Sequence, residues 1–235
     1  MNTVAAAKFF FKDENWMSNA LIGTVFLIIP ILGPMALAGW HTEIAQRIHR
    51  NDPEPIPKLS FNDLMTYFQR GIPAFVAQLV AILPLAFGIG LLMGVLMPVM
   101  MLLGRNSEVL VLVLALFLAV LCLALSVASI VVVSAFQTRA ELTEDLNKAL
   151  DFKGNLRYMR ATFGTTLASY FVFLLVCIPL VLVGMLACCV GIYPVAVGIN
   201  TGAVHLRLQI YEKYVRDGGE PFEVRDPEAP LKKYF

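Results

Sequence analysis

The chain has 235 residues, of which 58% are hydrophobic and only 15% are charged, and its formal net charge is +1. Its mean hydropathy of +0.74 lies well above the range of soluble globular domains. The basic residues are spread over several segments and form no single patch, which excludes a nucleic-acid-binding module. We therefore expect an all-α integral membrane protein, a multi-span helical bundle with membrane lipids as its surroundings and no nucleic acid as a partner.

The N-terminal segment 4–16 mixes aromatic with charged residues, a composition typical of a helix at the membrane interface. It leads into the first apolar block, 20–38, which contains the helix breakers Pro30, Gly33 and Pro34. Either these residues mark the apex of a re-entrant hairpin with the N-terminus inside, or they kink a single crossing with the N-terminus outside. The sequence leaves both arrangements open.

Four more apolar blocks follow, at 72–103, 109–136, 165–187 and 190–206. A run of about 18 or more uncharged residues is long enough to cross a bilayer. Gly191 and Pro194 break the helix between the last two blocks, which predicts two helices joined by a tight turn.

The polar segments 41–70, 137–160 and 207–235 carry most of the Lys and Arg residues, whereas the short turn 104–108 carries only Arg105. Because cytoplasmic loops are enriched in Lys and Arg, we expect the three long segments in the cytoplasm and the turn outside.

The segment 142–163 places apolar residues at three- and four-residue spacings opposite a face with Lys148, Lys153, Arg157 and Arg160. This pattern predicts an amphipathic helix on the cytoplasmic membrane surface. The four basic side chains would then contact anionic lipid headgroups.

The apolar blocks together predict one polytopic membrane domain over residues 1–215. The remaining segment, 216–235, is rich in Gly, Pro and charge, so we expect a flexible cytoplasmic tail.

A two-fold internal repeat is suggested by the two Gly/Pro breaks, each of which precedes an arginine by the same spacing. Pro34 lies 13 positions before Arg47, and Pro194 lies 13 positions before Arg207 (47 − 34 and 207 − 194). Each half of the chain would then contain a broken hairpin.

Candidate polar chemistry is sparse. If the two hairpins pack side by side, His41, Glu43, His205 and Arg207 would form a polar cluster, and a His beside a carboxylate can act as a base or a metal ligand. The alternative is that all four are interfacial residues whose side chains reach water at helix ends. No zinc-ligand spacing or catalytic motif is present, so we expect no enzyme activity, no cofactor and no metal.

Two isolated amides, Gln78 and Asn200, lie inside apolar runs. They either join helices by hydrogen bonds or line a pore.

The chain resembles an uncharacterised family of prokaryotic polytopic membrane proteins, the domain of unknown function 4013, in "NWMSNALIGTVFLIIPILGPMALAGWHTEIAQRIHR" and "FNDLMTYFQRGIPAFVAQLVAILP". The end of the chain, with "CCVGIYPVAVGINTGAVHLRLQIYEKY", is similar to the C-terminal half of such proteins. The resemblance implies a helical fold and the prokaryotic plasma (inner) membrane, and it implies no activity.

Two functional hypotheses fit these observations. The first is a non-enzymatic scaffold, partner subunit or membrane-shaping component that works as a homo-oligomer or with a protein partner. The second is a small transporter or permease for an apolar or lipid-like substrate, since broken helices in repeated halves are a common transporter plan. Apart from His205 at the end of the last block, the apolar blocks contain no carboxylate or base of the kind that ion-coupled carriers keep, which favours the first.

Overall fold

The computed structural model describes residues 2–103, 107–187, 190–231 and 234, and within these ranges it is helical throughout, with no strand. Its elements are α1 (Thr3–Phe9), η1 (Phe10–Lys12), α2 (Trp16–Ile28), α3 (Leu32–His49), η2 (Phe61–Asp63), α4 (Leu64–Leu103), α5 (Glu108–Thr143), α6 (Leu146–Ala149), α7 (Phe152–Leu186) and α8 (Ile192–Arg216). The helical segments Phe61–Leu103, Glu108–Thr143 and Phe152–Leu186 are long and apolar enough to cross a membrane. The expectation of an all-α fold is confirmed for the described residues, and three of its helices could span a membrane.

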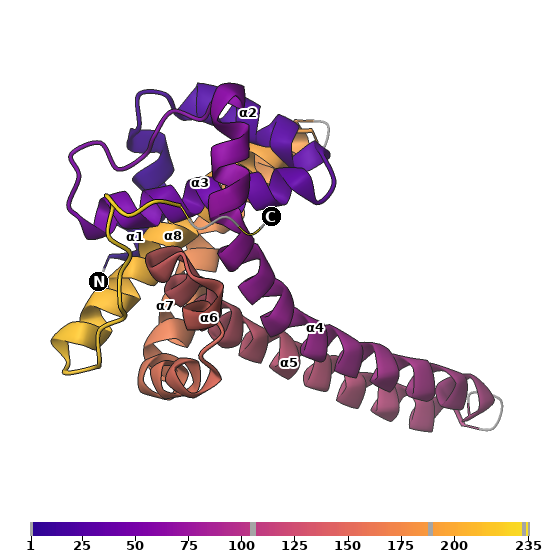
Figure 1. Ribbon diagram of the computed structural model, residues 1–235. Helices are drawn as coiled ribbons and strands as arrows, with labels where there is room; N and C mark the ends of the chain where they lie inside the picture. The colour runs from indigo at the N-terminus through magenta and orange to yellow at the C-terminus, as the bar shows by residue number, and fades with distance from the viewer. Residues whose placement is uncertain (1, 104–106, 188–189, 232–233, 235) are drawn as a thin grey trace.

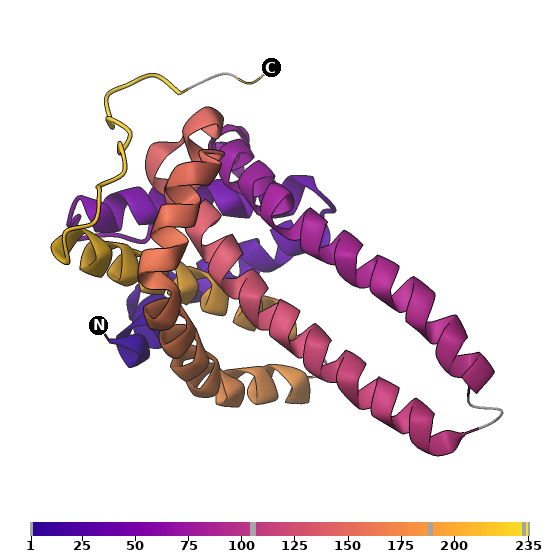
Figure 2. The same cartoon turned by 90° about the horizontal axis from the view of Figure 1, so that it is seen from below.

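Helices α4 and α5 form a long hairpin that projects from the rest of the molecule, the head (Figures 1 and 2). The buried residues of α4 lie near its start, between Tyr67 and Ala81, and nearly all those of α5 lie near its end. Farther out the apolar side chains are uncovered, and Phe87 and Phe117 are 68% and 61% exposed. The uncovered part of each helix, about 22 residues long, extends about 33 Å and matches a hydrocarbon core of about 30 Å. Residues 104–106 of the turn predicted at 104–108 lie outside the described residues.

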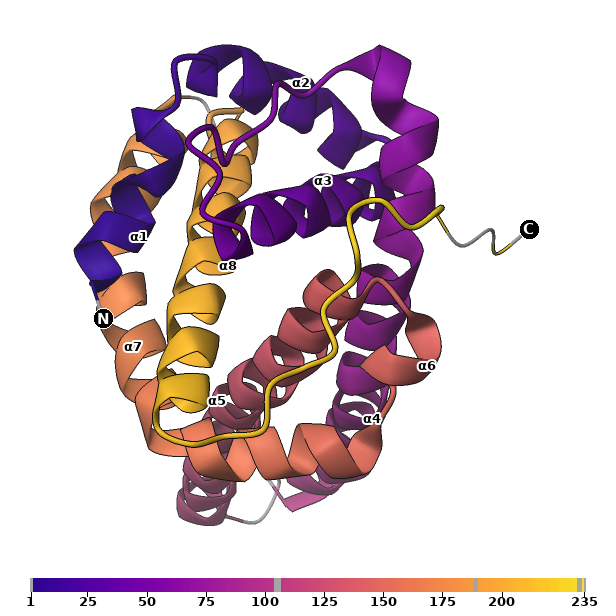
Figure 3. The ribbon, with the colours of Figure 1, turned by 60° about the vertical axis from the view of Figure 1, so that its left-hand side comes forward.

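The first apolar block folds back on itself. Helix α2 ends at Ile28, and Ile31 has a φ of 66° before α3 begins. A Cβ atom on Gly33 would lie 1.6 Å from the carbonyl oxygen of Phe26, so only glycine permits so tight a reversal. The two helices then pack as a hairpin and do not form one kinked helix (Figure 3).

The last two apolar blocks form a second hairpin from α7 and α8, with Gly191 as the N-cap of α8. Pro194 is the third residue of α8, as Pro34 is the third residue of α3, and a proline in the first helical turn breaks no intrahelical hydrogen bond. Helix α8 packs against both α2 and α3, so the two hairpins lie side by side (Figure 3). The internal repeat stays a prediction, because α7 is far longer than α2.

The single amphipathic helix predicted over 142–163 is wrong, because the chain divides this segment among α5, α6 and α7. Glu144 ends α5 in the left-handed conformation, with a φ of 46°. The carboxylates of Asp145 and Asp151 then accept hydrogen bonds from the backbone N–H groups of Asn147 and Gly154. Aspartates at these positions cap new helices, and the apolar spacing that we read as one helix runs across their boundaries.

Helix α7 buries polar side chains and exposes apolar ones. Asn155, Thr162 and Thr166 are buried, whereas Phe152, Phe163 and Phe171 are exposed. This inverted pattern suits a helix whose outer face meets lipid.

Two glycines allow a close contact where α3 crosses α4. A Cβ atom on Gly39 would lie 1.7 Å from the carbonyl oxygen of Tyr67, and one on Gly71 would lie 1.9 Å from that of Met35. The two backbones therefore touch, and both Gly39 and Gly71 are needed for this crossing.

The tail predicted to be flexible is instead held against the head over its described part. Phe222 is only 8% exposed, and its ring packs on Tyr211 at 4.7 Å and on Tyr158 at 5.2 Å. Its backbone N–H donates to the Tyr211 hydroxyl at 2.9 Å, and the N–H of Arg225 donates to the carbonyl oxygen of Leu142 at 2.9 Å. The polar composition of the tail gave no sign that one aromatic residue, Phe222, is buried and holds the tail in place.

The N-terminal segment, predicted to be interfacial, also packs into the head. Ala6 and Phe10 are buried, and α1 lies against α7 and α8.

Candidate functional site

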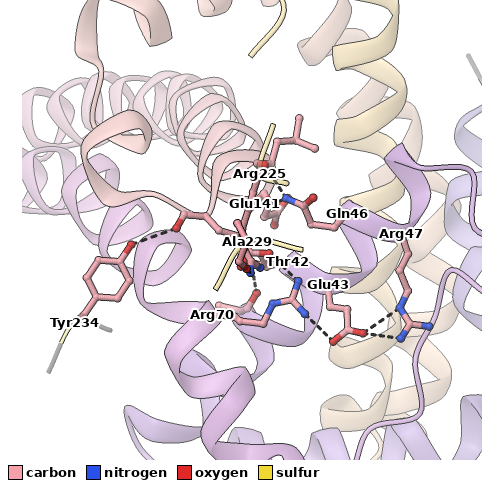
Figure 4. Close-up of polar contacts among 12 residues, drawn as sticks. Thr42, Glu43, Gln46, Arg47, Arg70, Glu141, Arg225, Ala229 and Tyr234 are labelled. Atoms are coloured by element: carbon pink, nitrogen blue, oxygen red, sulfur yellow. Dashed lines mark hydrogen bonds and ion pairs between the residues drawn. The ribbon is translucent and has the colours of Figure 1, made fainter. Parts of the chain in front are cut away.

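The polar ends of the helices meet in an ion-pair network inside the head (Figure 4). Glu43 of α3 pairs with Arg47 at 2.6 Å and with Arg70 of α4 at 2.9 Å. Glu144, which follows α5, pairs with Arg70 at 2.7 Å and with Arg225 of the tail at 2.8 Å. Charge-assisted bonds of this kind are about twice as strong as neutral ones. The network therefore links α3, α4, the end of α5 and the tail.

A second pair lies deeper. Glu141 of α5 and Arg207 of α8 are ion-paired, and their side chains are only 3% and 7% exposed. The Gln46 amide donates to the carbonyl oxygens of Glu141 at 2.9 Å and Leu142 at 2.7 Å, which satisfies the end of α5. A buried pair of this kind fixes the position of α8 against α5, because either charge left alone there would be strongly unfavourable.

The four residues of the predicted polar cluster come near one another but do not converge on one point. Glu43 and Arg207 belong to the two ion-pair systems above. His41 Nε2 lies 3.3 Å from the Thr201 hydroxyl, and His205 Nδ1 lies 2.8 Å from the side-chain amide of Gln209. The hairpins pack side by side as expected, yet each residue has a different partner.

Burial lowers the pKa of both histidines. Burial, with a further contribution from the positive charge of Arg207, lowers the pKa of His41 to about 3. Burial and the charge of Lys12 also lower the pKa of His205, whose ring stacks on Phe9 at 4.5 Å. In the hydrogen bonds described above, neither histidine is paired with a carboxylate.

No group of three or more His, Cys, Asp or Glu side chains that could hold a metal ion occurs among the described residues. Cys177 is buried and Cys122 is half-buried, both as free thiols. Cys188 and Cys189 lie outside the described residues.

Two of the four basic residues predicted to contact lipid have partners in the tail. Lys148 pairs with Glu223 at 2.7 Å, and Arg157 pairs with Glu220. Lys153 and Arg160 are exposed. The tail therefore covers part of the basic surface that the sequence indicates.

An open cleft of about 880 Å³ lies between the N-terminal segment, α3 and the proline-rich loop 53–58. Charges of both signs line it, among them Asp13, Lys58, Glu43 and Arg47. This mixture selects no single class of ligand.

The sequence reasoning missed Arg70, Glu141, Glu144 and Arg225. Arg70 directly precedes the charge-free part of α4, and Glu141 follows that of α5 with only Arg139 before it. Charged residues that border the apolar blocks could therefore have indicated this site. Their partners were not predictable in the same way, because they lie 27 to 81 positions away in the chain.

Of the two alternatives for the isolated amide Gln78, the structure has the hydrogen bond between helices, since the Gln137 amide of α5 donates to Gln78 of α4 at 2.9 Å. Asn200 instead donates to the carbonyl oxygen of Ala196 in its own helix.

No curated protein and no solved structure matches the chain. Residues 22–190, well over half of the chain, match the sequence model of a family described as "Protein of unknown function (DUF4013)". These residues include α3, α4, α5 and Glu141, whereas Arg207 and Arg225 lie beyond the matched range. The chain therefore belongs to the DUF4013 family, whose function is unknown.

Proposed function

We propose that the chain is a non-enzymatic scaffold or partner subunit of the prokaryotic plasma membrane, and that the α4–α5 hairpin is its association element. The proposal rests on one observation: the rest of the chain covers very little of this hairpin. In the most apolar 18-residue window of α4, and likewise of α5, only 6% of the residues are buried, against 22% for α7. Two membrane helices with so little internal contact offer their outer faces to lipid or to another protein.

Glycines on α4 support a protein partner in addition to lipid. Gly88, Gly90 and Gly94 have no atom within 4 Å of the position of a Cβ, in contrast to Gly39 and Gly71, which form the crossing of α3 and α4. Small residues let membrane helices approach closely. Internal packing does not use these three, so we assign them to contact with a second copy of the hairpin or another transmembrane helix.

The head would lie on the cytoplasmic side, because its ion pairs join the three segments rich in Lys and Arg. Lys153 and Arg160 remain free of the tail's carboxylates in the ion pairs described above and would contact anionic headgroups, at about 1 kcal/mol for each basic residue near the surface.

The test is the number of copies in lipid nanodiscs, measured by native mass spectrometry. The double variant Gly90→Leu/Gly94→Leu adds bulk to one face of α4, and the control Val95→Phe/Val99→Phe adds bulk to the opposite face. The wild type and the control should retain a second copy or a second protein, and the glycine variant should lose it. A wild-type protein that is monomeric and alone, or equal loss in both variants, would contradict the proposal.

A transporter for an apolar or lipid-like substrate is the second candidate. The contact between the broken hairpins favours it, since Gly23 of α2 packs directly on Val197 of α8 and discontinuous helices commonly form transporter sites. A stoichiometric lipid-like molecule released from monomers in the same spectra would support this alternative.

A further inference from the structure

A pocket of about 210 Å³ lies beneath the C-terminal tail, where α3 ends and α4 begins. Three arginines line it, and they come from three separate elements: Arg50 follows α3, Arg70 lies on α4 and Arg225 lies on the tail. Glu144 is the only carboxylate among the described residues of the lining, whose formal charge is therefore +2 (three arginines minus one glutamate), and Glu43, outside the lining, also pairs with Arg70. The other lining residues are Gln46, Thr66, Pro227 and Leu231.

The arginines retain hydrogen-bonding capacity after their ion pairs are counted. The two terminal nitrogens of Arg70 donate to Glu43 and Glu144, but its Nε is buried without a hydrogen-bond partner in the described part of the chain. Glu144 already accepts bonds from both Arg70 and Arg225. Arg50 is exposed, and no ion pair found within the described ranges includes it. A buried donor without an acceptor is unfavourable and is commonly completed by a water or an ion.

We propose that this pocket binds a single phosphate group, as a free anion or as the headgroup of a lipid. Guanidinium groups match the oxygen atoms of a phosphate in geometry and charge, and the Thr66 hydroxyl at the same pocket supplies a neutral donor. The pocket is smaller than the roughly 300 Å³ at which sites for drug-sized ligands begin, which limits the ligand to a small group. The tail forms one wall through Arg225 and Pro227, so the anion would also hold the tail in place. This inference does not depend on association through the hairpin.

The test uses the full chain in dodecyl maltoside, a detergent without phosphate. Calorimetric titration measures binding of inorganic phosphate, of dihexanoyl phosphatidic acid and of the matching diacylglycerol, which lacks the phosphate. Arg50→Gln removes one pocket charge without breaking an ion pair described above. Arg216→Gln, at the exposed end of α8, is the matched control.

The wild type and Arg216→Gln should bind phosphatidic acid, inorganic phosphate or both, and Arg50→Gln should bind about tenfold more weakly, as expected for the loss of one charged hydrogen bond. Binding of phosphatidic acid alone identifies a lipid headgroup, and comparable binding of inorganic phosphate identifies a free anion. If the wild type binds neither, or binds the diacylglycerol as tightly as the phosphatidic acid, the proposal is overturned. Equal affinities in Arg50→Gln and Arg216→Gln also overturn it, and the wild-type titration decides the matter if Arg50→Gln does not fold.

Discussion

The crossing of α3 and α4 should be highly sensitive to added volume. Substituting Gly39 by Ala places a Cβ atom 1.7 Å from the carbonyl oxygen of Tyr67, and substituting Gly71 places one 1.9 Å from that of Met35. Ordinary van der Waals contact needs more than 3.4 Å, so the helices must separate by well over 1 Å. Neither neighbour is a side chain that could rotate away.

We expect Gly39→Ala to lower the free energy of unfolding by about 2 kcal/mol. Overpacking costs about 3 kcal/mol at the upper end of its usual range, and the higher helix propensity of Ala returns about 1 kcal/mol. Gly71→Ala should cost a similar amount. Because a single separation relieves both clashes, the double variant should cost much less than the sum of the two.

The assay is equilibrium unfolding in mixed micelles, with Gly164→Ala in α7 as the control. No atom lies within 4 Å of a Cβ at Gly164, so this variant should be unchanged or more stable by up to about 1 kcal/mol. The reasoning is refuted if Gly39→Ala is as stable as Gly164→Ala, or if the costs of the two crossing variants simply add.

Three further predictions concern the charges of the head and the tail. Because the pKa of His41 is lowered from 6.5 to about 3, the unfolded chain binds more protons than the folded chain between these two pH values, and the free energy of unfolding should fall by up to about 1.4 kcal/mol per pH unit as the pH drops below 6.5. His41→Gln should reduce this slope in acid unfolding curves, and an unchanged slope would contradict the assignment. Arg207→Met should lower the free energy of unfolding by about 3–5 kcal/mol because it leaves the buried Glu141 without its partner, and the double variant Arg207→Met/Glu141→Leu should recover most of this loss. Both are measured by unfolding in the same micelles. A double variant no more stable than the single one would argue against a desolvated ion pair. Phe222→Ala should release the tail, so that limited proteolysis cleaves within 218–231 while the helical signal in circular dichroism stays constant. Continued protection of the tail from proteolysis would show that the ion pairs alone hold it.

The membrane helices were predictable because lipid imposes a strong requirement on sequence. A spanning helix must be long and uncharged, and the blocks 72–103 and 109–136 lie inside α4 and α5 as the structure has them. The break near Pro30 was also visible, because proline and glycine act through local backbone geometry. Its consequence, the fold-back at Ile31, required the contact between Gly33 and Phe26.

The head was less predictable because its contacts join distant parts of the chain. Nothing near Glu141 in the sequence indicates Arg207, and nothing in the tail's composition indicates that Phe222 packs on Tyr158 and Tyr211. The error over 142–163 has a local cause, since Asp145 and Asp151 are capping residues that the apolar periodicity outweighed in our prediction.

The proposed function requires the α4–α5 hairpin to cross the bilayer. This crossing is tested most directly by labelling single cysteines with a membrane-impermeant maleimide in intact cells, after the four native cysteines are replaced. Ser107→Cys, at the start of α5, should react from outside the cell, and Glu220→Cys, on the tail beside Arg157, should react only after permeabilisation. Labelling of both positions from the same side of the membrane would contradict the account.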